Sequence, residues 1–512
     1  MSASGERSTG MTWSLRAAGL VVAVMVYALL GGTELNLDAR FVAAVASLMA
    51  VWWMTEAIPL AATSLLPIVL IPALTQRTVA ETTASYASPI VFLFLGGFLI
   101  AIAMEKWGLH RRIALFTLAR VGVSPRRIIL GLMIATGFLS MWVSNTATTL
   151  MMLPIGFSVL ALVSGKAMSG ASAQPEIPSN QDAQEDPEIV RFGICLVLAI
   201  AWSASMGGLG TLLGSPPNAI IAGYASDELG VTIGFVDWML LGVPLAATFI
   251  LIGWLVMTRV LYRFELDEIP GGEALIQTEV TQLGSMSRGE AMVALVFVSA
   301  AFLWVVPGLL SEVESIAAAA PWLGNLNDTA IAIAAGLALF LLPASRGSGM
   351  VLDWKDAESG LPWGVLLLFG GGLSLAGAVA GTGLDDWFGQ QVSGLATLPV
   401  VALIACVVAI VLFLTEVTSN TATAATFIPV LGGVALGVGV DPMGLLVPAA
   451  LAATCAFMLP VGTPPNAIAF STGTVTIAQM ARGGFVLNLV GIALITGFVY
   501  WLGGAAMGLV FE

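Results

Sequence analysis

Long apolar stretches, separated by short polar joints, run through the whole chain. Residues 289–310, 362–380 and 484–508 are each close to the length of a bilayer-spanning helix and almost free of charge. About ten or eleven such segments can be counted, which is too many for the buried helices of one soluble core. The pattern predicts an all-α integral membrane protein with about 11 transmembrane helices.

Composition and the first residues support this class. Of the 512 residues, 58% are hydrophobic and 10% are charged, whereas about 25% are charged in a soluble globular protein. The apolar run 17–32 directly follows Arg16 and is expected to be a retained first helix rather than a cleaved signal peptide. Residues 1–16 then form a cytoplasmic N-terminus. The net charge of −13 argues against a nucleic-acid partner.

Lysine and arginine residues set the expected orientation in the membrane. One window without acidic residues contains six of them: Lys106, Arg111, Arg112, Arg120, Arg126 and Arg127. We therefore place this window in the cytoplasm. The chain is expected to span the inner membrane of the cell. The polar linker 264–288, bracketed by further arginines, is placed on the same side.

Two apolar regions carry a polar Ser-Asn-Thr triplet near their middle. Residues 128–164 contain the triplet 144–146, and residues 399–439 contain the triplet 419–421. Each region is too long for one span and fits two short helices. Irregular polar backbone at membrane depth is tolerated only where it is buried in protein or lines a cavity. We therefore expect two re-entrant hairpins. Basic residues flank the first and acidic or neutral residues the second, so they would enter from opposite faces.

A second motif recurs after each hairpin. Broken helices are expected at about 191–222, with Gly-Ser-Pro-Pro-Asn, and at about 444–472, with Gly-Thr-Pro-Pro-Asn. A polar insert near 165–190 lengthens the first copy. The chain therefore reads as an inverted repeat, about 41–263 and about 329–508. The expected divisions are a first half at 17–263, the linker 264–288 and a second half at 289–512.

The motifs indicate an anion site with cations nearby. Neither hairpin core contains lysine or arginine, so an anion would be held by helix N-termini, where free N–H groups and the positive dipole end point at it. Two such ends suit a dicarboxylate. Sodium prefers hydroxyl, amide and main-chain carbonyl oxygens, which glycine-rich and Pro-Pro breaks set free. Two plainer alternatives stay open: the triplets only cap the helices, and the breaks are only hinges.

Single ionisable residues add two questions. Glu416, three residues before Ser419, lies inside an apolar segment and is a functional candidate by default. It could carry a proton, tune a cation site or bond the hairpin backbone. Glu56 is expected to have a structural role. His110 is the one histidine; we expect an interfacial residue, with a pH-related role as the alternative.

Other function classes fit poorly. An intramembrane enzyme would need a nucleophile–base pair or a metal cluster at depth. With one histidine, no paired carboxylates and no ligand spacing, the chain is predicted not to be an enzyme. A passive channel is disfavoured because a closed, duplicated site suits occlusion more than open flow.

Together with the stretch Trp-Trp-Met-Thr-Glu-Ala-Ile-Pro at 52–59, the paired motifs resemble the divalent anion/sodium symporter family over nearly the whole chain. The resemblance implies a secondary transporter that imports C4-dicarboxylates (succinate, malate, fumarate), with sodium as coupling ion and no other cofactor; a citrate or sulfate carrier of the same fold is the alternative substrate class. It also implies a homodimer that works as an elevator. Alternatives within the same fold are a sodium-independent exchanger and a proton-coupled carrier.

The resemblance also implies site residues. Those for substrate are Ser144, Asn145, Thr146, Ser419, Asn420, Thr421, Pro217 and Pro465. Those for a first sodium ion are Ser140, Ser144 and Asn145 with backbone from Gly207 or Gly208. Those for a second sodium ion are Thr415, Thr418 and Asn420 with backbone near Gly462.

Overall fold

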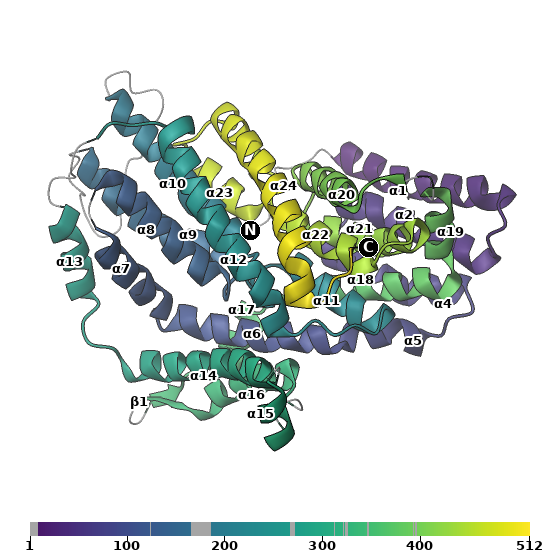
Figure 1. Cartoon of the computed structure of the whole chain (residues 1–512), viewed down its shortest axis with the longest axis horizontal. Helices are drawn as coiled ribbons and strands as arrows, with labels where there is room; N and C mark the ends of the chain where they lie inside the picture. The colour runs from purple at the N-terminus through teal and green to yellow at the C-terminus, as the bar shows by residue number, and fades with distance from the viewer. Residues whose placement is uncertain are drawn as a thin grey trace.

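The fold is described from a computed structural model (Figure 1). The residues it describes are 9–122, 124–164, 186–266, 272–311, 313–320, 322, 326–345, 348–392, 394 and 397–511. Most of the polar insert 165–190 and the first part of the N-terminus 1–16 lie outside these residues.

Helices make up almost all of the described chain. The first half comprises α1 (Thr9–Leu29), η1 (Leu30–Gly32), α2 (Leu37–Thr55), α3 (Leu60–Thr63), α4 (Leu66–Leu74), α5 (Val79–Ala84), η2 (Ser85–Ala87), α6 (Pro89–Lys106), α7 (Leu109–Val121), α8 (Pro125–Ser140), α9 (Asn145–Val163), α10 (Pro187–Gly207), η3 (Leu212–Gly214), α11 (Pro216–Glu228), α12 (Phe235–Val256) and η4 (Met257–Leu261). The remainder comprises α13 (Gly272–Gln282), α14 (Arg288–Ser311), α15 (Glu314–Ala319), α16 (Asp328–Leu341), β1 (Pro343–Ser345), β2 (Ser348–Met350), α17 (Trp354–Gly360), α18 (Trp363–Thr382), α19 (Leu384–Val392), α20 (Val400–Thr415), α21 (Asn420–Val438), α22 (Pro442–Thr454), α23 (Pro464–Ser471) and α24 (Ile477–Met507). Strands β1 and β2 form a short antiparallel hairpin.

Ten stretches within the described residues are long and apolar enough to cross a membrane. They are Met11–Gly32, Leu37–Thr55, Val79–Lys106, Asn145–Val163, Pro187–Gly207, Phe235–Leu261, Arg288–Leu310, Trp363–Thr382, Asn420–Val438 and Ile477–Met507. Four shorter apolar helical stretches accompany them. The predicted all-α membrane class is confirmed, with a number of candidate spans close to the expected 11.

Two helix pairs repeat in length and sequence. Helices α8 and α20 each have 16 residues, and α9 and α21, which follow them, each have 19. Both second helices begin at the asparagine of a Ser-Asn-Thr triplet, and both contain a proline at the same position, Pro154 and Pro429. The break between the two helices of each pair therefore falls at the triplet, as the apolar pattern predicts.

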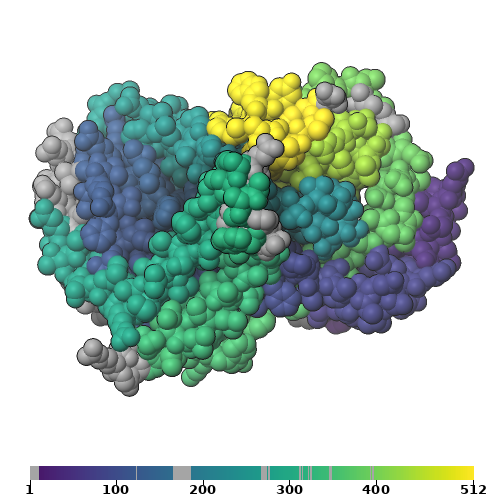
Figure 2. All heavy atoms as spheres, turned by 60° about the horizontal axis from the view of Figure 1, so that its bottom comes forward, coloured from purple at the N-terminus to yellow at the C-terminus, as the bar shows by residue number. Residues whose placement is uncertain are grey.

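The helix pairs lie on opposite sides of two central helices. Figure 1 shows α8 and α9 on the left and α20 and α21 on the right of α12 and α24, which pack against each other. Helix α9 contacts α10 and also α23, while α21 contacts α22 and also α11. Each pair is thus held by the broken helix of its own half and by one piece of the other. In Figure 2, the green helices of residues 288–341 lie across the front of the molecule.

Two details refine the expectations for loops. The linker 264–288 is not irregular throughout, because it contains α13. Glu56 ends α2 in the left-handed backbone region, with φ of 48°, and its side chain is exposed. An uncommon conformation for a residue with a side chain, at a helix end, fits the structural role expected for Glu56.

Candidate functional site

The two triplets begin helices in the way their residue types favour. Ser144 is the N-cap of α9 and its hydroxyl accepts the main-chain N–H of Ala147 at 3.3 Å. Ser419 takes the same position before α21, without a side-chain capping bond. The first N–H groups of a helix have no partner within the helix and carry the positive end of its dipole. Each triplet therefore presents main-chain donors at the break.

Unwound segments follow, where two further helices are interrupted. Helix α10 ends at Gly207 and α11 begins at Pro216; α22 ends at Thr454 and α23 begins at Pro464. Proline suits the first turn of a helix, where no N–H donor is needed, but it cannot continue the helix before it. The carbonyl groups between the two pieces are thereby freed from helical hydrogen bonds.

A first cluster of oxygen atoms surrounds Asn145. One end of the Asn145 amide lies 2.5 Å from Ser140 Oγ and 3.1 Å from each of the carbonyl oxygens of Ala204 and Gly214. If that end is the NH2 group, it can donate to these oxygens. If it is Oδ1, the Ser140 hydroxyl donates to it and two carbonyl oxygens face it, an arrangement that a cation would stabilise. Hydroxyl, amide and freed carbonyl oxygens are the ligands that suit sodium at membrane depth.

A second cluster, built in the same way, surrounds Asn420. The Thr415 hydroxyl donates to Asn420 Oδ1 at 2.7 Å and lies 3.1 Å from the Ala453 carbonyl oxygen. Asn420 Nδ2 lies 3.5 Å from the Thr454 carbonyl oxygen. Ser140 and Thr415 both stand five residues before the asparagine they contact. The two clusters therefore stand at matching positions of the two helix pairs.

The other residues expected at the sodium sites lie next to the two clusters. Gly208 packs against Asn145 so closely that a Cβ would lie 2.8 Å from its Oδ1, while Gly207 packs against the main chain of Gly137. The Thr418 hydroxyl pairs with Thr423 at 2.6 Å. Gly462 packs against the main chain of Glu416. The carbonyl groups that do face the asparagines were missed because only the folded path of an unwound segment identifies them.

Residues expected to bind substrate differ in exposure. Ser144 is exposed, and Asn145, Thr146, Ser419 and Asn420 are half-buried, so these polar groups can be reached from outside. Thr421, Pro217 and Pro465 are buried. The prolines therefore shape the start of α11 and α23 from within the protein.

The two halves meet through a hydrogen bond between the breaks. Ser215 Oγ and Thr454 Oγ1 are 2.9 Å apart, and both side chains are buried. Ser215 follows Gly214, whose carbonyl faces Asn145, and Thr454 is the residue whose carbonyl faces Asn420. The two oxygen clusters are thus linked by a short chain of protein groups.

Glu416 bonds the backbone of the second break. Its carboxylate oxygens accept the main-chain N–H groups of Phe457 at 2.8 Å, Met458 at 3.0 Å and Leu459 at 3.1 Å. Asn488 Nδ2 donates to the same carboxylate at 2.7 Å. Of the roles left open for Glu416, the geometry agrees with the bond to backbone, although the backbone is that of the broken helix.

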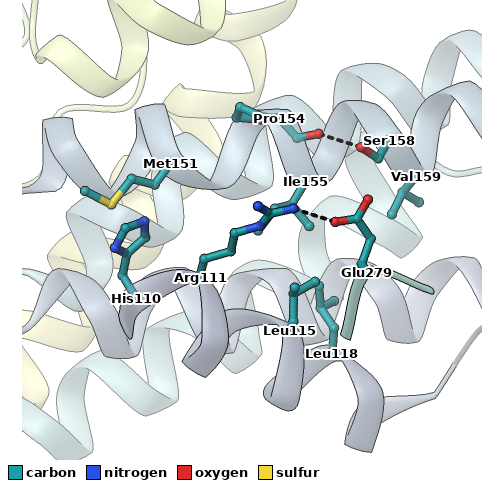
Figure 3. Close-up of a pocket in the computed structure, with 10 residues that line it drawn as sticks. All are labelled: His110, Arg111, Leu115, Leu118, Met151, Pro154, Ile155, Ser158, Val159 and Glu279. Carbon is teal, nitrogen blue, oxygen red and sulfur yellow. Dashed lines mark hydrogen bonds and ion pairs between the residues drawn. The ribbon is translucent and has the colours of Figure 1, made fainter. Parts of the chain in front are cut away.

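A cleft of about 360 Å³ opens elsewhere, between α7, α9 and α13 (Figure 3). Its lining is mostly apolar, and its charged groups, Arg111 and Glu279, pair with each other at 2.8 Å. Burial lowers the pKa of His110, which also lines the cleft, so its ring is neutral at pH 7. Residues of the two oxygen clusters do not line this cleft, and it is not where an anion would be held.

Comparisons with known proteins agree with the helix arrangement and the motifs. Residues 11–507 match the family described as the sodium:sulfate symporter transmembrane region. The chain is 42% identical over 471 residues to the sodium-dependent dicarboxylate transporter SdcS of Staphylococcus saprophyticus, covering 92% of this chain and 87% of that protein. SdcS of Staphylococcus aureus strain USA300 matches with the same identity and coverage.

Solved structures of distant sequence share the fold. The YdaH transporter of Alcanivorax borkumensis superposes with a TM-score of 0.60 at 13% identity, over 98% of this chain and 99% of that one. MtrF of Neisseria gonorrhoeae superposes with a TM-score of 0.55 at 14% identity, over 95% and 98%. With a family match over almost its whole length, this chain belongs to the sodium:sulfate symporter family of membrane transporters and is not an enzyme.

Proposed function

We propose that this protein imports C4-dicarboxylates such as succinate, malate and fumarate, driven by sodium. The observation that carries the proposal is the pair of equivalent oxygen clusters around Asn145 and Asn420, each at the start of a helix. The 42% identity to sodium-dependent dicarboxylate transporters supports the same substrate class and coupling ion.

The chemistry of the site suits an anion with two charged ends. The N-termini of α9 and α21 each offer free main-chain N–H groups and hydroxyls, one set for each carboxylate. Sodium held by the adjacent oxygens offsets the charge of the dicarboxylate. Substrate and ions then favour each other's binding, which is the coupling that symport needs.

Transport requires that this site open to one side at a time. We infer an inverted repeat in which the hairpins α8–α9 and α20–α21 enter the membrane from opposite faces. The equal helix lengths of the two pairs and the packing of each against the other half support it. The hairpins and broken helices would move as one body against a fixed scaffold, as an elevator. A homodimer in the cell inner membrane, with its N-terminus in the cytoplasm and with scaffold segments 17–75 and 289–345 at the interface, completes the proposal.

The test is uptake of labelled succinate into proteoliposomes under three conditions: an inward sodium gradient, an equal potassium gradient, or internal succinate alone. Accumulation that depends on the sodium gradient is expected. Accumulation only with internal succinate would replace symport by exchange, and no uptake in any condition would shift the substrate to citrate or sulfate.

A further inference from the structure

Two asparagines outside both oxygen clusters are equivalent to each other. Asn218 and Asn466 each follow the second proline of a Pro-Pro pair, within the first turn of α11 and α23. Both have an exposed fraction of 0%. A fully buried amide requires hydrogen-bond partners. The partners of Asn218 and Asn466 therefore indicate the role of each side chain.

Each amide holds two carbonyl groups of the unwound segment before it. Asn218 Nδ2 donates to the carbonyl oxygens of Gly208 at 2.9 Å and Thr211 at 2.8 Å. Asn466 Nδ2 donates to those of Ala456 and Leu459, both at 3.0 Å. In both halves the acceptors lie ten and seven residues before the asparagine.

Each loop also contains a main-chain hydrogen bond to one of these two carbonyl groups. Gly214 N donates to the Thr211 carbonyl at 3.3 Å, and Gly462 N donates to the Leu459 carbonyl at 3.2 Å. The carbonyl seven residues before each asparagine therefore receives both a side-chain and a main-chain donor. The two loops therefore share this pair of hydrogen bonds, in segments whose sequences differ at most positions.

Only a short side chain with two donors on one atom can make this contact. Carbonyl groups only accept, so the NH2 of each amide must face them and Oδ1 must point away. Among the described residues, Oδ1 of Asn218 and Oδ1 of Asn466 are both buried without a hydrogen-bond partner. The orientation is thus fixed by the two carbonyl groups of the loop rather than by the oxygen of the amide.

The loops held in this way form the back of the oxygen clusters. Gly208, bonded by Asn218, is the residue whose Cβ would meet the Asn145 amide, and Gly214 presents its carbonyl to that amide. In the other half, the loop held by Asn466 begins just after Thr454, whose carbonyl faces Asn420. A change in loop shape would move carbonyl groups that the asparagines of the triplets contact.

We propose that Asn218 and Asn466 are positioning residues for the two sodium sites: they set the shape of the loop that presents the Gly214 carbonyl in the first half and of the loop that directly follows the Thr454 carbonyl in the second, without touching sodium or dicarboxylate. The proposal rests on the proposed function, because it assigns a role within sodium binding. Partners one step behind a metal ligand typically change metal affinity about 10–100-fold when they are altered.

The experiment replaces each asparagine by aspartate, which keeps the size and removes both donors. Purified Asn218→Asp and Asn466→Asp proteins are reconstituted, and the sodium concentration for half-maximal succinate uptake is measured beside the KM for succinate at saturating sodium. We expect the sodium concentration for half-maximal uptake to rise about 10-fold or more. The KM for succinate should stay within about 2-fold, because the main-chain and side-chain donors of the triplets are unchanged. The sodium-induced rise in the unfolding temperature of the purified protein should shift to higher sodium concentration in parallel.

The matched control is Asn327→Asp, the same chemical change at the N-cap of α16, where aspartate caps equally well. It should leave the sodium dependence unaltered. Asn218→Ser and Asn466→Ser, which keep one donor, form a second pair and should give intermediate shifts.

Wild-type sodium dependence in the aspartate and serine variants would overturn the proposal. So would failure of all four variants to fold, since the asparagines would then belong to the fold rather than to the ion sites. These outcomes differ from failure of the proposed function, which would appear as sodium-independent uptake by the unsubstituted protein.

Discussion

At the scale of single residues, the two oxygen clusters are built from matching side chains but differ sharply at one position beside them. Ser140 and Thr415, and Asn145 and Asn420, make corresponding contacts. The residue four positions before the asparagine is Met141 in the first half and Glu416 in the second. Met141 packs against Gly210, whereas Glu416 accepts hydrogen bonds from the main chain of its break.

Replacement of either triplet asparagine should abolish transport. Asn145→Ala and Asn420→Ala remove the amide at the centre of each oxygen cluster, so sodium-driven succinate uptake should fall to background while the protein still reaches the membrane. Uptake into proteoliposomes and the amount of purified protein are the two measurements. Ser158→Ala on α9, whose hydroxyl bonds only its own helix at Pro154, is the control and should transport normally. Normal uptake by both asparagine variants would remove these residues from the site.

Glu416→Gln distinguishes an anchor from a proton carrier. The amide nitrogen of glutamine would face main-chain N–H donors, and hydrogen bonds to a charged group are worth about 1.5–3 kcal/mol each. We expect a lower unfolding temperature and a higher sodium concentration for half-maximal uptake. Uptake should still be driven by sodium, and its response to pH should be unaltered. Uptake driven by a proton gradient in the unsubstituted protein, and lost in Glu416→Gln, would contradict the anchor role.

At the scale of elements, α7 is tied to the start of α14 by a buried ion pair. Arg112 bonds both carboxylate oxygens of Glu290 and also reaches the carbonyl groups of Leu283 and Gly284. The two side chains are 11% and 6% exposed. The neighbouring pair Arg111–Glu279, between α7 and α13, is 50% and 23% exposed. Arg111 and Arg112, adjacent residues of α7, thus allow an exposed ion pair to be compared with a buried one.

Glu290→Gln should destabilise the protein far more than Glu279→Gln. Loss of one partner leaves the buried guanidinium of Arg112 uncompensated, which costs about 3–5 kcal/mol, whereas an exposed pair contributes about 0–1 kcal/mol. Unfolding of the two purified variants in detergent, followed side by side, measures the difference. Equal losses of stability would show that α7 is not held through Arg112.

Breaks between helices that depend on local residue types could be predicted from the sequence, whereas contacts between distant segments could not. The break in each helix pair was predictable because Ser-Asn-Thr is too polar for lipid and favours a helix start. The end of α10 at Gly207 followed from glycine, whereas α22 ends at Thr454, six residues before the first proline of its break. The carbonyl groups of Ala204 and Gly214 were not predictable, since the path of unwound backbone depends on contacts from distant segments. Trp142 likewise stacks on Phe235 of α12 and on Trp304 of α14, a contact that no local pattern encodes.

At the scale of the whole molecule, the distribution of charge predicts opposite orientations for the two hairpins. Ser124 and Ser164 flank the first hairpin, and Thr397 precedes the second. Basic residues near the first should keep its ends in the cytoplasm, and the absence of lysine and arginine near the second should leave its ends outside. Such opposition is what an inverted repeat requires, and it is the feature of the proposal on which alternating access depends.

Single cysteines test this opposition directly. Among the native cysteines, Cys406 is exposed and would first be replaced by alanine, whereas Cys195 and Cys455 are buried. A membrane-impermeant maleimide added to intact cells should label Thr397→Cys but not Ser124→Cys or Ser164→Cys, and all three should be labelled after the membrane is permeabilised. Labelling of all three from outside would place both hairpins on one face. The two halves would then be related by an axis along the membrane normal, and not by the two-fold axis in the membrane plane that the proposed alternating access requires.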